Sequence, residues 1–345
     1  MKNCSKRSFI ASALATATVG LIPRRTRAAL TATATHQELY PLTPDENVAR
    51  VRPANLAYPP LDVRRYGAKL DATWDGSAVT GTDDSAAFQR AISVAGISGR
   101  EITFIGPTRL LNVALRTGVS IRGIGNPTIY VAPIAPTDAG FVATGTVGTP
   151  VPLTANARPG DSVVRIADTS GLRVGSWVLL ATDEYVFATS GRKRQIARVV
   201  AVTSDSVRLG RELIDDFEVS HAASLAAFTE SVHDFAVSGL RIQIAKGTNG
   251  GGINLSHASN FRIHNVEIIG AAALPGIRCT ACAFGDIGGN TIRACQNTAS
   301  GGSSGLAVDI IESSHHIKVH DNILMEYTEV EFGMRVRYCE FSNNT

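Results

Sequence analysis

Short repeats in the last third of the chain carry side chains that could do chemistry at matching positions. The repeats begin at Gly252, Gly276, Gly305 and Gly333, which are 24, 29 and 28 residues apart by subtraction. This period is typical of stacked repeat units. Because side chains alternate between the two faces of a strand, one outer face is expected to hold a set of polar residues, with neighbouring strands about 4.8 Å apart. The set is Asn254, Arg278, Asp309, Arg335 and Arg337.

These residue types fit the cleavage of a sugar chain that carries carboxylates. A guanidinium pairs bidentately with a carboxylate, so Arg278 and Arg335 are expected to bind a uronate, and Asn254 is a further substrate contact. Elimination also needs a base for the α-proton, which Arg337 supplies if its pKa is lowered. Asp309 is a candidate acid, base or calcium ligand, so Ca²⁺ stays open as a cofactor.

Hydrolysis is the competing chemistry, and it needs two carboxyl groups. The acids near this face are Asp309, Glu312, Asp321, Glu326, Glu329 and Glu331. Three arginines beside one acid favour elimination on an acidic glycan over hydrolysis. The alternative to any chemistry is an ordinary salt-bridged outer surface.

Histidine and cysteine do not point to a metal site. His264 and His320 occupy matching places in repeats that are two apart, so no metal coordination is predicted. An even number of cysteines in an exported protein permits disulfides, although Cys279 is expected to pack inside the repeat. The cysteines left after signal removal are Cys279, Cys282, Cys295 and Cys339.

Two short strands in each repeat must position these residues. In the first strand, apolar residues are expected to face inward: Ile253, Leu255, Ile277, Cys279, Leu306, Val308, Met334 and Val336. A second strand follows, and then a recurring asparagine, at Asn265, Asn290, Asn322 and Asn344. Stacked asparagines can bond the backbone of the next repeat, so this ladder is a structural signal.

The stretch Leu61–Ile92 reads as a short strand, a polar loop and a helix. Asp83 and Asp84 are expected to cap the helix, which runs from Asp84 to about Ala95. Its apolar stripe is Ala87, Phe88, Ala91, Ile92 and Ala95. A helix with one apolar face is expected to cover the first repeat and to block edge-to-edge pairing there.

This part of the chain resembles the pectate-lyase-3 or rhamnogalacturonase-like family of pectin-lyase-like proteins. The resemblance rests on the order DVRRYGA, a Gly/Asp loop, TDDSAAFQRAI, EITFIGPTRLL and GVSIRGIGNPTIYV, closely over 61–131 and loosely after Val232. It implies an all-β fold, a right-handed parallel β-helix with an N-terminal capping helix. The same opening introduces lyases, hydrolases, epimerases and phage-tail depolymerases, so the reaction is left open. The polygalacturonase-like signatures are not found in order.

Composition divides the chain into five parts. Residues 1–34 resemble a twin-arginine export signal with Lys6 in place of the first arginine, and 35–60 read as an extended linker with several prolines. Residues 61–150 hold the cap and first coils, and 151–228 a β-rich insertion with a solvated hairpin tip at Gly191–Arg194. Residues 232–345 hold the remaining coils, which are expected to be C-terminally truncated because the chain stops inside a repeat.

The composition of the whole chain limits the class of partner. It has 345 residues, a net charge of +3, and 18 % charged and 44 % hydrophobic residues. Nothing here favours nucleic acid, and no membrane partner is expected once the signal is removed. The sequence predicts an exported, periplasmic or extracellular enzyme that degrades an acidic polysaccharide, as a lyase rather than a hydrolase. A non-catalytic glycan-binding or structural β-helix, or an inactive remnant, is the alternative.

Overall fold

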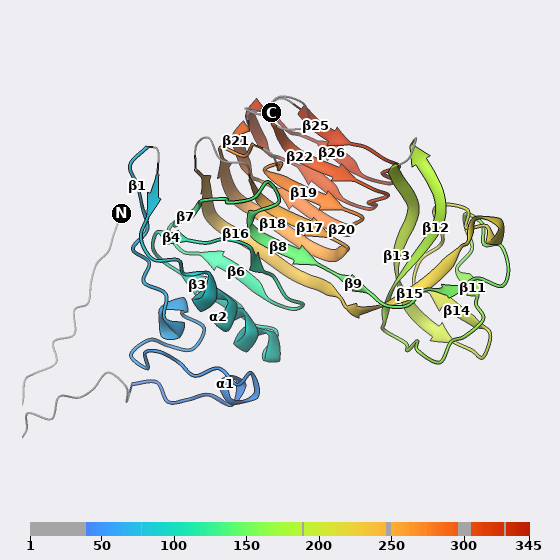
Figure 1. Cartoon of the computed structure of the whole chain (residues 1–345), viewed down its shortest axis with the longest axis horizontal. Helices are drawn as coiled ribbons and strands as arrows, with labels where there is room; N and C mark the ends of the chain where they lie inside the picture. The colour runs from blue at the N-terminus through green and yellow to red at the C-terminus, as the bar shows by residue number, and fades with distance from the viewer. Residues whose placement is uncertain are drawn as a thin grey trace, which may run out of the picture. The chain divides into compact units, whose positions relative to one another are not determined.

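Two parallel sheets built from successive coils form the body of the fold (Figure 1). The computed structural model describes residues 39–76, 78–187, 190–245, 250–272, 274–295, 305–327 and 329–345. Chain contacts separate Met1–Thr35 from His36–Thr345, and all described residues lie in the second unit. The fold is the predicted right-handed parallel β-helix with an N-terminal capping helix and a β-rich insertion.

The short sheet takes one strand from each coil, and its strands lie side by side in Figure 1. In spatial order they are β5 (Val113–Ala114), β8 (Ala139–Thr144), β17 (Gly251–Ser256), β19 (Ile277–Thr280), β22 (Leu306–Ile311) and β25 (Glu329–Phe332). Ile253, Ile277 and Val308 are register partners in series and are buried, as predicted. Arg278 pairs with Asp309, not with Ala307 as an alignment on the glycines gives, but the two-residue offset leaves each side chain on its predicted face.

The long sheet takes one or two strands from each coil. Its main order is β3 (Glu101–Phe104), β6 (Ser120–Gly123), β16 (Val232–Ile244), β18 (Ala258–Ile269), β20 (Ala283–Gly288), β23 (Lys318–His320) and β26 (Glu340–Ser342). Further strands are β4 (Thr108–Arg109), β7 (Thr128–Val131), β21 (Thr291–Cys295) and β24 (Ile323–Tyr327). The core lies between the two sheets, where stacking of coils brings the rings of Phe235 and Phe261 to 5.7 Å.

The asparagine ladder is real for three of the four predicted residues. Asn322 is fully buried and accepts hydrogen bonds from the backbone N and Nδ2 of Asn290, both at 2.9 Å. It donates to the Ile287 carbonyl oxygen at 3.1 Å and to Asn344 Oδ1 at 2.8 Å. The placement of Asn265 in the ladder is wrong, because Val266 fills that position and its N–H donates to Asn290 Oδ1.

The capping helix α2 (Ser85–Ser98) buries the predicted apolar stripe, with Gly99 in the left-handed conformation at its end. Its Phe88 ring meets the Phe104 ring edge-on at 5.1 Å, which ties the helix to β3. Asp83 Oδ1 accepts a hydrogen bond from the Ser85 N–H at 2.9 Å. Asp84 makes no side-chain cap. Its buried carboxylate instead accepts from the backbone of Lys69 and Leu70 and from Thr108 Oγ1, so the predicted cap residue anchors a loop.

The residues before the capping helix, expected to form an extended linker up to residue 60, contain regular secondary structure. Pro44–Val48 forms the short helix α1, capped by Thr43. Glu46 and Arg65 form an ion pair with no exposed side-chain surface at either residue. Val63–Tyr66, predicted as a strand, is a turn of 3₁₀ helix, because Asp62 caps it and Gly67 ends it in the left-handed conformation. A hairpin of β1 (Thr73–Trp74) and β2 (Val79–Thr80) follows.

The insertion is an antiparallel sheet with its own apolar core. Its strands are β9 (Thr146–Val147), β10 (Val151–Pro152), β11 (Val163–Arg165), β12 (Trp177–Phe187), β13 (Ser190–Val202), β14 (Ser206–Leu209) and β15 (Ser224–Glu230). A 3₁₀ turn lies at Val219–His221. The predicted solvated tip at Gly191–Arg194 is correct in part. These residues lie on β13 at the turn end of its hairpin with β12, where Arg192 is exposed. Lys193, however, is buried with ion pairs to Glu184 and Asp216.

Strand β13 docks the insertion on the turns that follow β22. The Ile196 N–H donates to His315 Nε2 at 3.2 Å, and Ser313 Oγ donates to the Arg192 carbonyl oxygen at 2.9 Å. Arg194 pairs with Glu312 at 2.9 Å. Polar contacts from Glu312, Ser313 and His315 therefore hold β13 against the coils.

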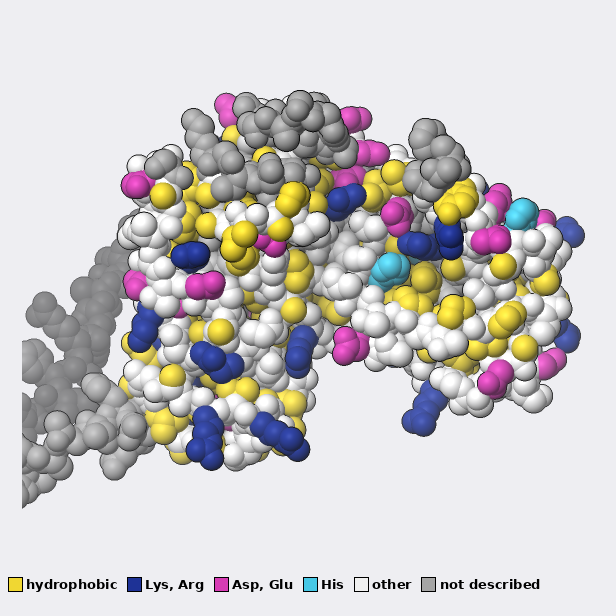
Figure 2. Space-filling view, viewed as in Figure 1, with side chains coloured by type: hydrophobic (Ala, Val, Ile, Leu, Met, Phe, Trp, Pro, Cys, Tyr) yellow, Lys and Arg dark blue, Asp and Glu magenta, His cyan; other side chains and the backbone are white. Residues whose placement is uncertain are grey.

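The surface and the cysteines add two observations. On the face in Figure 2, basic side chains gather at the lower left of the view, while acidic ones lie mostly along its upper edge and at the right. Cys279, Cys282, Cys295 and Cys339 are free thiols, and Cys279 is buried inside the coil as predicted. No helix in the part of the chain that the structure describes is long and apolar enough to cross a membrane.

Candidate functional site

One row of polar side chains crosses the outer face of the short sheet. The register pairs Asn254 with Arg278, Arg278 with Asp309, and Asp309 with Glu331. These residues belong to β17, β19, β22 and β25, so successive members lie on strands about 4.8 Å apart. The structure thus brings together Asn254, Arg278 and Asp309 from the predicted set and adds Glu331. We call these four residues the short-sheet row.

Asp309 is the buried member of this row. Its side chain is 4 % exposed, while that of Arg278 is 32 % exposed, and Arg278 Nε lies 3.2 Å from Asp309 Oδ2. Asp309 Oδ1 is buried and has no hydrogen-bond partner among the described residues. Burial raises the pKa of Asp309, the Arg278 charge opposes the rise, and Glu331 and Glu329 add to it, which leaves the pKa at about 7.

A carboxyl group that titrates near neutral pH can give or take a proton during catalysis. Glu331 supplies a second carboxyl on the next strand, which is the pairing that glycoside hydrolysis requires. The charges that act on Asp309 are one guanidinium, that of Arg278, and two carboxylates, those of Glu329 and Glu331. This region is therefore less positive than the row of three arginines that the sequence predicts. It suits a neutral sugar better than an acidic one.

Arg335 and Arg337 lie outside the short-sheet row. The predicted strand at Gly333–Arg337 is wrong, because β25 ends at Phe332 and both Met334 and Arg335 have positive φ, at 54° and 67°. Arg335 instead binds Asp215 of the insertion in a bidentate pair, at 2.9 and 2.8 Å. That pairing raises the pKa of Arg335.

Arg337 is the more exposed of the two arginines, and its Nε lies 3.9 Å from Asp215 Oδ1. The geometry thus gives both arginines a contact with the insertion. A role for either one in substrate binding or proton transfer stays a prediction.

A second row lies at the corner where each coil enters the long sheet. Asp234, Asn260, Phe284, His316 and Tyr338 occupy this corner in five coils, and all have φ between 49° and 57°. The residues before them pair in series, Ser259 with Ala283, Ala283 with His315, and His315 with Arg337. We call this set the corner row. It escaped the sequence reasoning because its members share a backbone conformation and not a residue type.

The corner row faces a cleft of about 320 Å³ beside the insertion. Trp177, Arg198 and Arg211 line it from the insertion, and Asp234, Asn260 and Phe284 line it from the coils. The Arg211 guanidinium lies 4.8 Å from the centre of the Phe284 ring. Beyond Phe284, the rings of His316 and Tyr338 stack at 5.2 Å. Aromatic faces beside amide and charged groups are suited to binding a sugar, through its C–H face and its hydroxyls.

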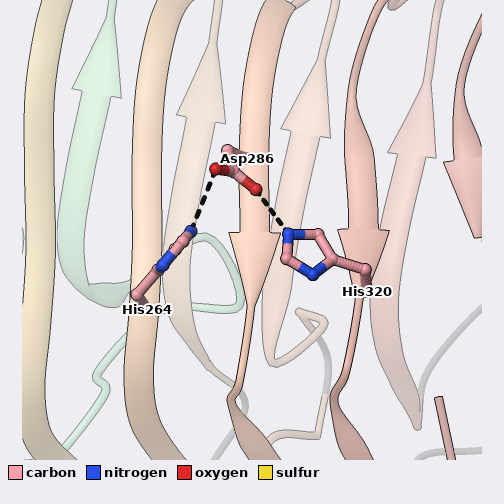
Figure 3. Close-up of side chains that lie close together, drawn as sticks. All are labelled: His264, Asp286 and His320. Carbon is pink, nitrogen blue, oxygen red and sulfur yellow. Dashed lines mark hydrogen bonds and ion pairs between the residues drawn. The ribbon is translucent and has the colours of Figure 1, made fainter. Parts of the chain in front are cut away.

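A third group lies on the outer face of the long sheet. One nitrogen of His264, one nitrogen of His320 and one carboxylate oxygen of Asp286 all lie within 4.8 Å of one another (Figure 3). The sequence reasoning placed the two histidines two coils apart and predicted no coordination. It missed Asp286, which the intervening strand places between them.

Comparison with known sequences gives no family assignment. No protein-family model matches the chain. No curated protein matches it either. The predicted place in the pectate-lyase-3 family stays a prediction.

Comparison with solved structures finds phage tailspikes. Tailspike gp61 of Pseudomonas phage phi297 matches with a TM-score of 0.60 and 14 % identity, over 82 % of this chain and 51 % of its own. The Gp54 tailspike of Acinetobacter baumannii bacteriophage AP22, in complex with an A. baumannii capsular saccharide, matches with a TM-score of 0.57 and 13 % identity. That match covers 76 % of this chain and 44 % of the tailspike. The chain thus spans about half the length of these proteins, and the likeness establishes the fold.

Proposed function

We propose that this protein is exported and degrades a polysaccharide, with Asp309 as its catalytic acid. The observation that carries the proposal is a buried carboxyl group with a pKa of about 7, in register with Arg278 on one side and Glu331 on the other. A general acid works best when its pKa is near the working pH. Arg278 is partly exposed, so the ion pair of Arg278 and Asp309 faces solvent on the side of Arg278.

The choice of a polysaccharide rests on the fold and on the shape of the surface. The Gp54 tailspike, with a similar fold, is in complex with a capsular saccharide. A stack of parallel coils offers a repeating surface, along which a repeating polymer can make the same contact several times. The resemblance of residues 61–131 to the pectate-lyase-3 family supports the same substrate class. Export is supported by the basic, then apolar, N-terminal residues.

Hydrolysis fits the short-sheet row better than elimination. Asp309 can protonate the leaving oxygen while Glu331 activates water or attacks the sugar directly. Elimination on a uronate needs net positive charge at the sugar carboxylate, but Arg335 is already paired with Asp215. Elimination stays the second chemistry, with Arg278 on the uronate and ionised Asp309 as the base.

Glycan binding without cleavage is the second candidate function, and the cleft beside the corner row favours it. Trp177 and Phe284 line the cleft with aromatic rings, Arg211 lies over the Phe284 ring, and Arg198 and Arg211 carry hydrogen-bond donors. A Trp177→Ala variant should then weaken polysaccharide binding whether or not the protein cleaves.

A panel of polysaccharides tests the proposal. The full chain is incubated with pectin, alginate, neutral plant glycans and bacterial capsular polysaccharides, and the products are assayed in two ways. We expect new reducing ends without the absorbance of unsaturated uronates. Reducing ends together with that absorbance would establish elimination instead. No product from any polysaccharide, in a folded sample, would overturn the enzymatic proposal and leave glycan binding.

Matched variants assign the activity to Asp309. Asp309→Asn should lower the rate at least 100-fold, on the order expected for loss of a general acid. Asp205→Asn is the control, because Asp205 lies on the insertion and its pair with Arg165 is exposed, at 63 % and 65 %. Equal loss in both variants would contradict a specific role for Asp309.

A further inference from the structure

We propose that His264, Asp286 and His320 bind a divalent transition-metal ion on the outer face of the long sheet. The three residues come from β18, β20 and β23, which are neighbouring strands of three successive coils. This site lies on a different sheet from Asp309. It goes beyond the proposed function and does not depend on it.

The three side chains converge as metal ligands do. His264 Nε2 lies 3.3 Å from Asp286 Oδ2, and His320 Nε2 lies 2.7 Å from Asp286 Oδ1. Figure 3 shows both imidazoles pointing at the carboxylate from opposite sides. Tetrahedral zinc, with bonds of about 2.0–2.1 Å, separates its ligand atoms by about 3.3 Å, so small movements would admit an ion.

A glycine in the middle coil makes the arrangement possible. The register aligns His264 with Gly288 and Gly288 with His320. A Cβ atom at Gly288 would lie 2.6 Å from His320 Cε1 and 2.8 Å from His320 Nε2. Any side chain there would therefore push the His320 ring out of place. Asp286, two residues earlier on the same face, fills the middle of the group instead.

The outer contacts of the group are also those of a metal site. His320 Nδ1 lies 2.8 Å from Asp321 Oδ2, so a second carboxylate can hold this ring with Nε2 turned toward Asp286. Metal-bound histidines usually have such a partner. His264 Nε2 is buried and makes no hydrogen bond among the described residues, although its pair with Asp286 is close.

The ligand set selects the class of ion. Two imidazoles and one carboxylate suit zinc and its neighbours in the first transition row, whereas calcium takes oxygen ligands. Arg262 and Lys318 are the register partners of Asp286 on its two sides, which disfavours an ion held by charge alone. Three protein ligands leave a fourth position for water. An ion here would fasten three coils to one another.

Zinc titration of the full chain, prepared without a polyhistidine tag and treated with a chelator, tests the proposal. Calorimetry should give one zinc ion per chain, and cobalt added in its place should give the visible bands of a four-coordinate ion. Asp286→Asn and His320→Ala should each weaken zinc binding at least tenfold. Zinc should raise the Tm of the wild-type protein and leave the Tm of these variants unchanged.

Two further variants keep the test decisive. His221→Ala is the matched control, because it also removes a histidine near a carboxylate. His221 lies on the insertion, 3.9 Å from the carboxylate of Asp183. This variant should bind zinc as the wild type does. Gly288→Ala removes no ligand, but it should weaken binding by displacing the His320 ring, and it decides the matter if His320→Ala misfolds. The proposal would be overturned if the wild type bound no zinc. It would also be overturned if Asp286→Asn and Gly288→Ala bound zinc with the stoichiometry and affinity of the wild type.

Discussion

The carboxyl group of Asp309 makes the stability of the protein depend on pH. Its pKa of about 7 in the folded state lies above the value of about 3.9 in an unfolded chain. The folded state therefore holds the proton more tightly, so stability falls as pH rises from about 4 to about 7 and is level above that.

Asp309→Asn mimics the protonated carboxyl and should remove this loss. Relative to the wild type, we expect the variant to gain stability between pH 4 and pH 8, by up to about 4 kcal/mol for a shift of about three pKa units. Thermal unfolding of both proteins across this range checks the prediction. A difference in Tm that is the same at pH 4 and pH 8 would show that Asp309 titrates normally.

Glu46 and Arg65 form a buried pair whose loss should be costly. Arg65 also donates to the carbonyl oxygens of Tyr40, Tyr58 and Pro41, so the guanidinium stays buried when Glu46 is removed. We expect Glu46→Ala to destabilise the fold by about 3–5 kcal/mol. Glu101→Ala, which removes an exposed partner of Arg122, should cost less than about 1 kcal/mol. Similar losses in denaturant unfolding would refute the distinction.

At the scale of the element, the asparagine ladder links the coils through buried side chains. Asn322→Ala removes four hydrogen bonds, among them the one from the buried backbone N–H of Asn290. The expected cost is about 2–4 kcal/mol. Asn265→Ala, outside the ladder and exposed, should cost only about 1 kcal/mol, because alanine is disfavoured at its φ of 53°. Denaturant unfolding compares the two variants, and equal stability would contradict the ladder.

The docking of the insertion should weaken in acid. His315 is buried and accepts the Ile196 N–H, and burial, with the charges of His316 and Arg211, lowers the pKa of His315 to about 3. Since an unfolded histidine has a pKa of about 6.5, the stability that neutral His315 supplies is complete above that pH and is lost as pH falls toward 3.

Hydrogen exchange checks this element directly. After correction for the intrinsic rates, the backbone amides of β13 should be less protected from exchange at pH 5 than at pH 7. The amides of β18 should stay protected at both pH values. A His315→Gln variant, which has no titrating ring, should show less change with pH. Protection of β13 that does not vary with pH in the wild type would contradict the role of His315.

Period-two alternation explains why the sequence predicted the strands better than their register. Ile277, Cys279 and Val308 face inward as expected, because sliding a strand by two residues preserves its faces. For the same reason, the alternation could not show that Arg278 pairs with Asp309 and not with Ala307. The alignment on Gly333 failed because fewer residues separate β24 from β25 than separate β21 from β22. The strand of the last repeat is therefore Glu329–Phe332, which comes before Gly333.

At the scale of the whole molecule, the capping helix and the parallel coils were predictable, because local patterns specify them. Contacts between distant segments were not. Arg335 pairs with Asp215, which is 120 residues away, and no local pattern records that pairing. Asp286 and the corner row are visible only once the coils are stacked in register. Three of the five predicted site residues, Asn254, Arg278 and Asp309, lie together on one sheet face, and their roles stay predictions.

The rate at which reducing ends are released from the polysaccharide that the wild-type protein depolymerises tests the central claim most directly. The assay compares the wild type with Asp309→Asn at pH 5 to 8. If Asp309 is the catalytic acid, kcat falls at least about 100-fold in the variant while KM changes little, because the carboxyl acts in the transition state. An Asp309→Asn protein that is folded and keeps more than about half of the wild-type kcat would contradict the account.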